Sequence, residues 1–304
     1  MRPEPDAFVS VPVPGGELAV ARWGRGHVPV LAAHGITASS MSWRAVARHL
    51  DDASMTLWAP DLRGRGASAG VGGPFGLERH AHDLLAVADH LGLDRVVLAG
   101  HSLGAFVAVL AAVARPEQVE RVVLVDGGLP LQLAVEGVDP DAVLDAALGP
   151  AIQRLDQTYP SFAAYEAFWR QHPAFAQNWS HDIEAFVRYD VTETADGGLR
   201  SRVVADAVRS DGRDLLLGRE PIGRALDAIR CPVHLLRAPR GMFDEPPVLQ
   251  PDELVAHWAT RIADLSDDVV HDTNHYTILM GGRGASAVAD ALAHAPWDRR
   301  QASS

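Results

Sequence analysis

Apolar residues follow two patterns that alternate along most of the chain. Short apolar runs, typical of half-buried or buried strands, are followed by longer segments with apolar residues at helical spacing. The runs predict strands at residues 8–13, 17–23, 28–33, 55–59, 96–99, 121–125, 232–236 and 269–270. The helical pattern covers residues 43–50, 77–91, 105–114, 254–262 and 285–294. Strands that alternate with helices favour a mostly parallel central sheet with helices on both faces.

The first two strands are an exception, because only Pro14, Gly15 and Gly16 separate them. So short a connection predicts an antiparallel hairpin.

The alternation stops between residues 129 and 229. This stretch is polar and helical in character, with no strand of the buried kind. It holds nine of the 19 aromatic residues: Tyr159, Phe162, Tyr165, Phe168, Trp169, Phe175, Trp179, Phe186 and Tyr189. We therefore predict a helical cap, or lid, at residues 129–229, inserted after the sixth strand of one core formed by residues 1–128 and 230–304.

Composition excludes several classes of function. The chain has 304 residues, 47% of them hydrophobic, and a formal net charge of −12, which argues against a nucleic-acid partner. All 27 basic residues are arginines. Cys231 is the only cysteine, so no intrachain disulfide can form. Residues 1–6 lack the apolar core of a signal peptide, and no apolar run has membrane-spanning length. We expect a cytoplasmic protein with no membrane partner; the oligomeric state stays open.

One stretch carries a chemical signature. The apolar run at residues 96–99 leads into Gly100-His101-Ser102-Leu103-Gly104, and the small-residue helix at 105–114 follows. A strand, a tight Gly-x-Ser-x-Gly turn and a helix form a nucleophile elbow, which presents a serine hydroxyl above the sheet. Gly100 and Gly104 leave room where a Cβ would crowd the strand or the helix.

Other motifs stand in a characteristic order around this elbow. His34-Gly35 follows an early strand, and Asp61-Leu62-Arg63-Gly64-Arg65-Gly66 follows the next. Asn274-His275-Tyr276 comes after the last strand. Together these motifs resemble the α/β-hydrolase superfamily. The resemblance implies the α/β-hydrolase fold, no cofactor, and a catalytic triad in the order serine, acid, histidine.

Carried onto this sequence, the resemblance implies that Ser102 is the nucleophile and His275 the base that takes its proton. The acid that orients the base is then Asp244, in the loop after the seventh strand of the family's core. Asp126, at the end of the strand after the elbow helix, is the alternative acid, and Glu245 is a distant third.

The remaining site residues follow from the same resemblance. The N–H groups of Leu103 and Ile36 are expected to form the oxyanion hole. His34 is expected to shape the oxyanion loop without titrating. The candidate substrate-binding residues are Met41, Trp43, Trp169 and Trp179. No His-Glu-x-x-His and no paired Cys or His spacing occurs, so no metal site is predicted.

The leading hypothesis is a serine hydrolase that cleaves an ester, thioester or lactone of a small, largely apolar substrate through an acyl-enzyme. The alternatives are a carbon–carbon bond hydrolase of a diketone-type substrate and a non-catalytic ligand-binding protein on the same fold.

Four other features have simpler interpretations. His80 and His82 are expected on a solvated helix face. Residues 61–68 are expected to form a structural loop near the rim of the site. Arg170 could hold a substrate carboxylate, but a surface salt bridge is favoured.

Overall fold

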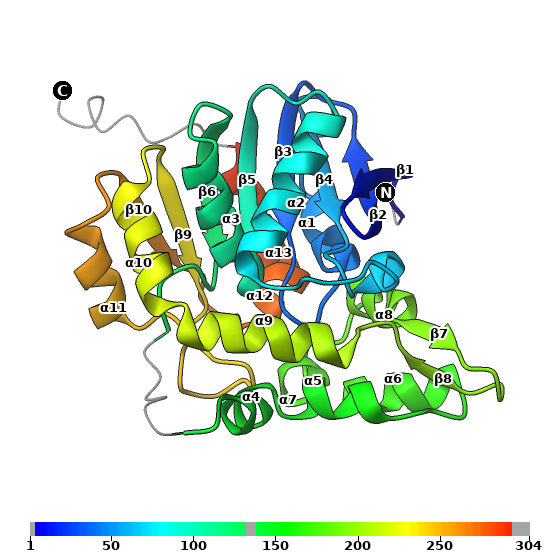
Figure 1. Cartoon of the computed structure of the whole chain (residues 1–304). Coiled ribbons are helices and arrows are strands. Elements are labelled where there is room, and N and C mark those ends of the chain that lie inside the picture. The colour runs from blue at the N-terminus through cyan, green and yellow to red at the C-terminus, as the bar shows by residue number, and fades with distance from the viewer. Residues whose placement is uncertain (1–3, 132–137, 294–304) are drawn as a thin grey trace.

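The computed structural model describes residues 4–131 and 138–293. Its centre is one eight-stranded sheet in the order β1-β2-β4-β3-β5-β6-β9-β10 (Figure 1). The strands are β1 (Ala7–Val13), β2 (Gly16–Gly24), β3 (Val28–Ala33), β4 (Met55–Pro60), β5 (Val96–His101), β6 (Val119–Val125), β9 (Val233–Arg237) and β10 (Leu265–Val269). The pairs β1–β2 and β2–β4 are antiparallel and all other pairs are parallel, which confirms the mostly parallel sheet.

Strand β5 lies in the middle of this sheet, between β3 and β6, and every residue in it is buried. Its side chains alternate between the two faces, as a strand requires. Val96 and Leu98 belong to one apolar cluster, and Val97 and Ala99 belong to the other. A strand buried on both faces reads as a continuous apolar run, which is the pattern found in the sequence.

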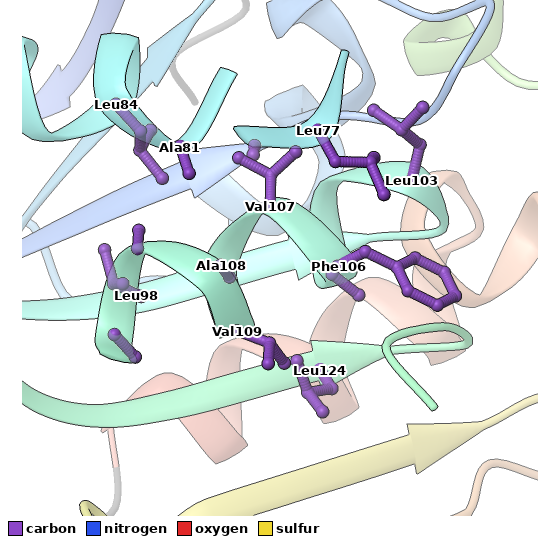
Figure 2. Close-up of a cluster of buried hydrophobic side chains, with 14 of the residues drawn as sticks. Leu77, Ala81, Leu84, Leu98, Leu103, Phe106, Val107, Ala108, Val109 and Leu124 are labelled. Atoms are coloured by element: carbon purple, nitrogen blue, oxygen red, sulfur yellow. The ribbon is translucent and has the colours of Figure 1, made fainter. Parts of the chain in front are cut away.

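Helices cover both faces of the sheet. The first cluster contains α2 (Leu77–His90), α3 (Leu103–Ala114) and α11 (Asp252–Ala259), and the second contains α1 (Arg44–Ala47), α12 (Thr277–Met280) and α13 (Gly282–Ala293). Short 3-10 turns η1 (Ser40–Trp43) and η2 (Gly66–Ser68) complete the core loops. Figure 2 shows Val107 of α3 directed toward Leu77 and Ala81 of α2, while Val109 lies beside Leu124 of β6.

The stretch between β6 and β9 is largely helical, as predicted, and lies along one end of the sheet (Figure 1). Its elements are α4 (Pro140–Leu148), α5 (Pro150–Gln153), η3 (Arg154–Asp156), α6 (Phe162–Arg170), α7 (Pro173–Ala176), α8 (His181–Tyr189), β7 (Val191–Glu193), β8 (Leu199–Ser201), α9 (Ala205–Leu217) and α10 (Arg219–Ala228). The β7–β8 hairpin was not predicted, because each of its strands is only three residues long. We call residues 129–229 the inserted segment; its status as a separate cap stays a prediction.

Some predicted bounds differ from those in the structure. Strand β10 begins at Leu265, although only residues 269–270 read as a strand, because the exposed Ser266, Asp267 and Asp268 interrupt the apolar run at this sheet edge. The helix predicted at 43–50 is only four residues long as α1. The predicted end of the last helix, His294, lies outside the described residues. None of the described helices combines the length and apolar character that crossing a bilayer requires.

Candidate active site

Ser102 sits in the tight turn between β5 and α3, with a backbone φ of 55° and ψ of −121°. A positive φ is strained for a residue with a side chain, and such strain is typical of a nucleophile elbow. The flanking glycines permit the turn. A Cβ on Gly100 would lie 2.1 Å from the Gly104 carbonyl oxygen, and one on Gly104 would lie 2.1 Å from that of Ala33.

His275 faces this serine from the loop between β10 and α12. Its Nε2 lies 3.1 Å from Ser102 Oγ. The loop is fixed on both sides of the ring, because Asn274 Oδ1 accepts the N–H groups of Tyr276 and Thr277 at 3.0 and 2.9 Å. His101 Nε2–H donates to the His275 carbonyl at 2.7 Å. These hydrogen bonds fix the main chain around His275 and so position its ring.

The acid that contacts His275 is Asp126. Its Oδ2 lies 2.7 Å from His275 Nδ1, and its Oδ1 accepts the N–H of Ala238 at 3.1 Å. The contact leaves the proton on His275 Nδ1, so the Nε2 lone pair points at the Ser102 hydroxyl. Asp126 and His275 are 1% and 2% exposed, so water does not screen this contact.

The expected acid, Asp244, does not contact His275, and this expectation is corrected. Its Oδ1 instead accepts Asn274 Nδ2 at 2.8 Å and Arg240 Nε at 2.7 Å. Burial alone would raise the pKa of Asp244, but these two donors outweigh it and lower that pKa. Asp126 directly follows β6, the neighbour of the nucleophile strand β5, and this position brings its carboxylate to His275. Asp244 is held instead by Arg240 of its own loop. Glu245, the third candidate, is exposed.

The loop after β3 lies against the nucleophile. A Cβ on Gly35 would be 3.3 Å from Ser102 Cβ, so this glycine allows close approach. His34 Nδ1–H donates to the Gly35 carbonyl at 2.8 Å, and its Nε2 accepts the Leu62 N–H at 2.9 Å. Burial lowers the pKa of His34 to about 3, which keeps it neutral. Leu103 begins α3, and the first N–H groups of a helix have no intrahelical acceptor.

A narrow cavity of about 20 Å³ opens at Ser102 and His275. This is room for about one water molecule. Its remaining lining is mainly apolar: Gly35, Ile36, Thr37, Ala38, Ser42, His101, Trp169, Phe186, Met242, Tyr276 and Met280. No Asp, Glu, Lys or Arg is among the described residues that line it. The cavity thus favours an uncharged, apolar group beside the nucleophile.

Only one of the four predicted substrate-binding residues lines this cavity, namely Trp169. Met41 lines a separate surface groove with Arg44 and Arg48. Trp43 is fully buried in the core and is not among the described residues that line this cavity.

Trp179 also lies away from the cavity. Its ring lies 4.1 Å from the Arg170 guanidinium, which in turn is paired with Glu166 at the surface, as the sequence favoured.

Sequence reasoning missed four large lining residues, Phe186, Met242, Tyr276 and Met280. A signal existed for two of them. Tyr276 directly follows the base, and Met280 is one helical turn further on in α12. No signal in the sequence distinguishes Phe186 from the other aromatics of the inserted segment. Among the residues that the structure describes, no group of three His, Cys, Asp or Glu could hold a metal ion.

Comparisons with known proteins agree with the observed fold. A family model described as the alpha/beta hydrolase fold matches residues 28–182, half of the chain. Lipase LipV from Mycobacterium tuberculosis is 37% identical over 133 residues, which are 43% of this chain and 48% of the relative. N-formylmaleamate deformylase from Pseudomonas putida is 40% identical over 104 residues, 34% of this chain and 38% of the relative. The chain thus matches less than half the length of either relative.

A solved structure extends the likeness over nearly the whole chain. The crystal structure of E-2-(acetamidomethylene)succinate hydrolase has a TM-score of 0.76 at 24% identity, and covers 94% of this chain and 98% of its own. At this identity the likeness concerns the fold alone. Together with the family match, it shows that the chain belongs to the α/β-hydrolase fold family.

Proposed function

We propose that this protein is a serine hydrolase that cleaves an ester, thioester or lactone with a small, uncharged acyl group through an acyl-enzyme. The observation that carries the proposal is the continuous contact from Ser102 Oγ to His275 Nε2 at 3.1 Å and from His275 Nδ1 to Asp126 at 2.7 Å. A serine hydroxyl is a weak nucleophile at neutral pH, so it needs a base within hydrogen-bond reach. Here the base has a fixed tautomer and a buried carboxylate behind it.

In the first half-reaction, Ser102 Oγ attacks the substrate carbonyl carbon while His275 Nε2 takes the hydroxyl proton. Asp126 stabilises the imidazolium that forms. When the tetrahedral intermediate collapses, its bond to the leaving alcohol or thiol breaks, and His275 returns the proton to that group. Ser102 is then acylated. In the second half-reaction, His275 Nε2 takes a proton from water as the water oxygen attacks the acyl carbon. The bond from that carbon to Ser102 Oγ then breaks, His275 returns the proton to Oγ, and the carboxylic acid is released.

The N–H groups of Ile36 and Leu103 are proposed to stabilise the negative oxygen of each intermediate. One such donor is typically worth about 3 kcal/mol in the transition state. Both residues adjoin the nucleophile: Ile36 lines the cavity, and Leu103 follows Ser102 at the start of α3.

The substrate class is inferred from the cavity. Its lining has no Asp, Glu, Lys or Arg among the described residues, so a charged acyl group would lose its hydration without a counterion. The small volume favours short acyl groups, because longer ones require side chains such as Trp169 to move. The name of the lipase relative is compatible with ester cleavage.

The test is a fluorophosphonate probe, which forms a bond to a serine activated beside an oxyanion hole. We expect one adduct, on Ser102, that is absent in Ser102→Ala and His275→Ala. The same proteins are then assayed with p-nitrophenyl acetate, butyrate and octanoate, a thioester, a lactone and a diketone. No adduct and no ester turnover by folded protein would refute the proposal, and turnover of the diketone alone would favour carbon–carbon hydrolysis.

A further inference from the structure

Three successive carbonyl groups beside the nucleophile are held by hydrogen bonds from buried side chains or the main chain. They belong to residues 35–37, here called the oxyanion loop. The Gly35 carbonyl accepts His34 Nδ1–H at 2.8 Å and the Ala38 N–H at 3.1 Å. The Ile36 carbonyl accepts Arg65 Nε and Nη2 at 3.0 and 2.9 Å. The Thr37 carbonyl accepts Arg154 Nη2 at 2.8 Å.

These bonds fix the direction of the loop's N–H groups. A peptide unit is planar and trans, so its carbonyl and its N–H point in opposite directions. The bonds to the Gly35 carbonyl therefore set the direction of the Ile36 N–H. Those from Arg65 and Arg154 hold the next two peptide units, which prevents the loop from rotating away from Ser102. Such preorganisation is what makes an oxyanion hole effective.

Arg65 reaches the loop from the core and is tied to the inserted segment. It is fully buried, and its Nη1 lies 2.5 Å from Asp211 Oδ2 of α9. Asp211 also accepts His80 Nε2–H at 2.8 Å and the Gly76 N–H at 2.6 Å. His80 was expected on a solvated face; it is buried because α9 crosses α2 here, whereas His82 is exposed as expected (Figure 1).

Arg154 reaches the loop from the inserted segment itself. It is fully buried, and its Nε donates to Asp190 Oδ2 at 3.2 Å and to the Tyr165 hydroxyl at 3.1 Å. Its guanidinium lies 4.8 Å from the ring of Trp169, which lines the cavity. Nε and both Nη atoms of Arg154 have protein acceptors, as do those of Arg65. The guanidinium groups of both arginines are therefore occupied by contacts within the protein.

We propose that Arg65 and Arg154 are positioning residues for the oxyanion loop, so that packing of the inserted segment against the core completes the oxyanion hole. This inference rests on the proposed hydrolase function. We call each arginine, together with its hydrogen bonds to the oxyanion loop, a clamp. Each clamp joins the two parts of the chain: Arg65 of the core binds Asp211 of the inserted segment, and Arg154 of the inserted segment binds Thr37 of the core. Loosening either clamp disorganises the transition-state contacts and leaves the ground-state pocket in place.

The chain offers a matched control for each arginine. Arg63 is equally buried and binds Asp83 through Nε and Nη2 at 2.6 and 2.8 Å, but its carbonyl acceptors are Gly72 and Pro14, outside the oxyanion loop. Arg121 is buried at the start of β6 and donates to the Leu292 carbonyl. Lysine keeps the charge at each position but loses the planar fork, so Arg→Lys tests the clamp rather than the charge.

The experiment compares Arg65→Lys with Arg63→Lys, and Arg154→Lys with Arg121→Lys, with rates normalised to the folded fraction from near-ultraviolet circular dichroism. We expect kcat and the rate of fluorophosphonate labelling to fall roughly 10-fold to 100-fold in Arg65→Lys and Arg154→Lys, with KM nearly unchanged. The ³¹P resonance of the Ser102 adduct should shift in these two variants only, because its phosphoryl oxygen occupies the oxyanion hole.

The possible outcomes distinguish a positioning role from a purely structural one. If Arg65→Lys reacts no more slowly than Arg63→Lys, and the ³¹P resonance of its adduct has the same position as that of Arg63→Lys, the clamp is structural only and the inference fails. If Arg65→Lys does not fold, the Arg154→Lys and Arg121→Lys pair answers the same question. If folded wild-type protein is neither labelled by the fluorophosphonate nor able to hydrolyse any of the esters, the hydrolase proposal itself fails and this inference fails with it.

Discussion

Replacing Asp126 with asparagine tests the assignment of the acid, and the structure predicts how the variant fails. The amide oxygen would keep the Oδ1 position, where it accepts the N–H of Ala238. The amide NH₂ would then point at His275 Nδ1, which must become an acceptor. The proton of the neutral ring moves to Nε2, where it faces Ser102 Oγ and blocks proton transfer. Asp126→Asn is thus expected to trap the wrong tautomer without disturbing the fold.

The magnitude has two parts. A carboxylate and an imidazolium with charge centres about 4 Å apart interact by about 4 kcal/mol at an effective dielectric constant of 20. At 1.36 kcal/mol per tenfold change, loss of this interaction lowers kcat about 10³-fold. The wrong tautomer adds to the loss. The well-studied aspartate-to-asparagine change in a serine protease triad costs about 10⁴-fold in kcat, and we expect a similar value here.

The matched control is Asp244→Asn. Its amide oxygen can still accept both Asn274 Nδ2 and Arg240 Nε, so kcat should stay within a few-fold of wild type. The assay is the initial rate of p-nitrophenyl acetate hydrolysis from pH 6 to 9, with the downfield ¹H resonance of His275 Nδ1–H as an independent readout. That resonance should disappear in Asp126→Asn and persist in Asp244→Asn. A larger loss of kcat in Asp244→Asn than in Asp126→Asn would refute the reasoning.

Two further predictions concern stability and specificity. Burial raises the pKa of Asp211, but Arg65 and His80 outweigh it and lower that pKa to about 2, from the usual 3.8. The folded state therefore binds fewer protons, and about 2 kcal/mol of stability is present above pH 4 and lost as the pH falls through 2. Urea unfolding at pH 7, 5, 4 and 3 should show that Asp211→Asn is less stable at neutral pH and lacks this part of the acid dependence; parallel pH curves for the two proteins would contradict the assignment. Trp169→Leu should enlarge the cavity and raise kcat/KM for p-nitrophenyl butyrate relative to acetate, whereas Trp179→Leu, away from the cavity, should leave that ratio unchanged; equal shifts in both variants would show that Trp169 does not limit acyl size.

The parts of the site that sequence predicts well are those encoded locally. The elbow around Ser102 needs one strand, one turn and one helix in succession, and the structure has all three. His275 likewise lies in the loop after the last strand and faces Ser102. The mostly parallel sheet follows from apolar runs such as β5, which are buried on both faces. In each case residues that are neighbours in the sequence determine the structure, so the local pattern is enough to predict it.

The acid depends instead on which loop reaches the histidine. Asp126 and Asp244 both follow strands, and the sequence gives no distance from either to His275. One local signal was available: Arg240 stands four residues before Asp244 and binds it, which leaves that carboxylate less free. The structure adds a reason that the sequence does not show: a Cβ on Gly127 would come within 2.5 Å of the Ser102 carbonyl oxygen. Such close approach brings the residue before it, Asp126, to the nucleophile turn.

The contacts of the inserted segment were the hardest to predict, because they join residues far apart in sequence. His80 shows the difficulty: helical spacing placed it on a solvated face, yet α9 buries it against Asp211. All basic residues of the chain are arginines, and Arg65 and Arg154 use a property of that side chain that lysine lacks. Arg65 donates to Ile36, Arg63 and Asp211 at once, which requires a planar fork with several N–H groups. The inserted segment therefore does more than border the cavity, because its Asp211 binds Arg65, which in turn donates to the oxyanion loop.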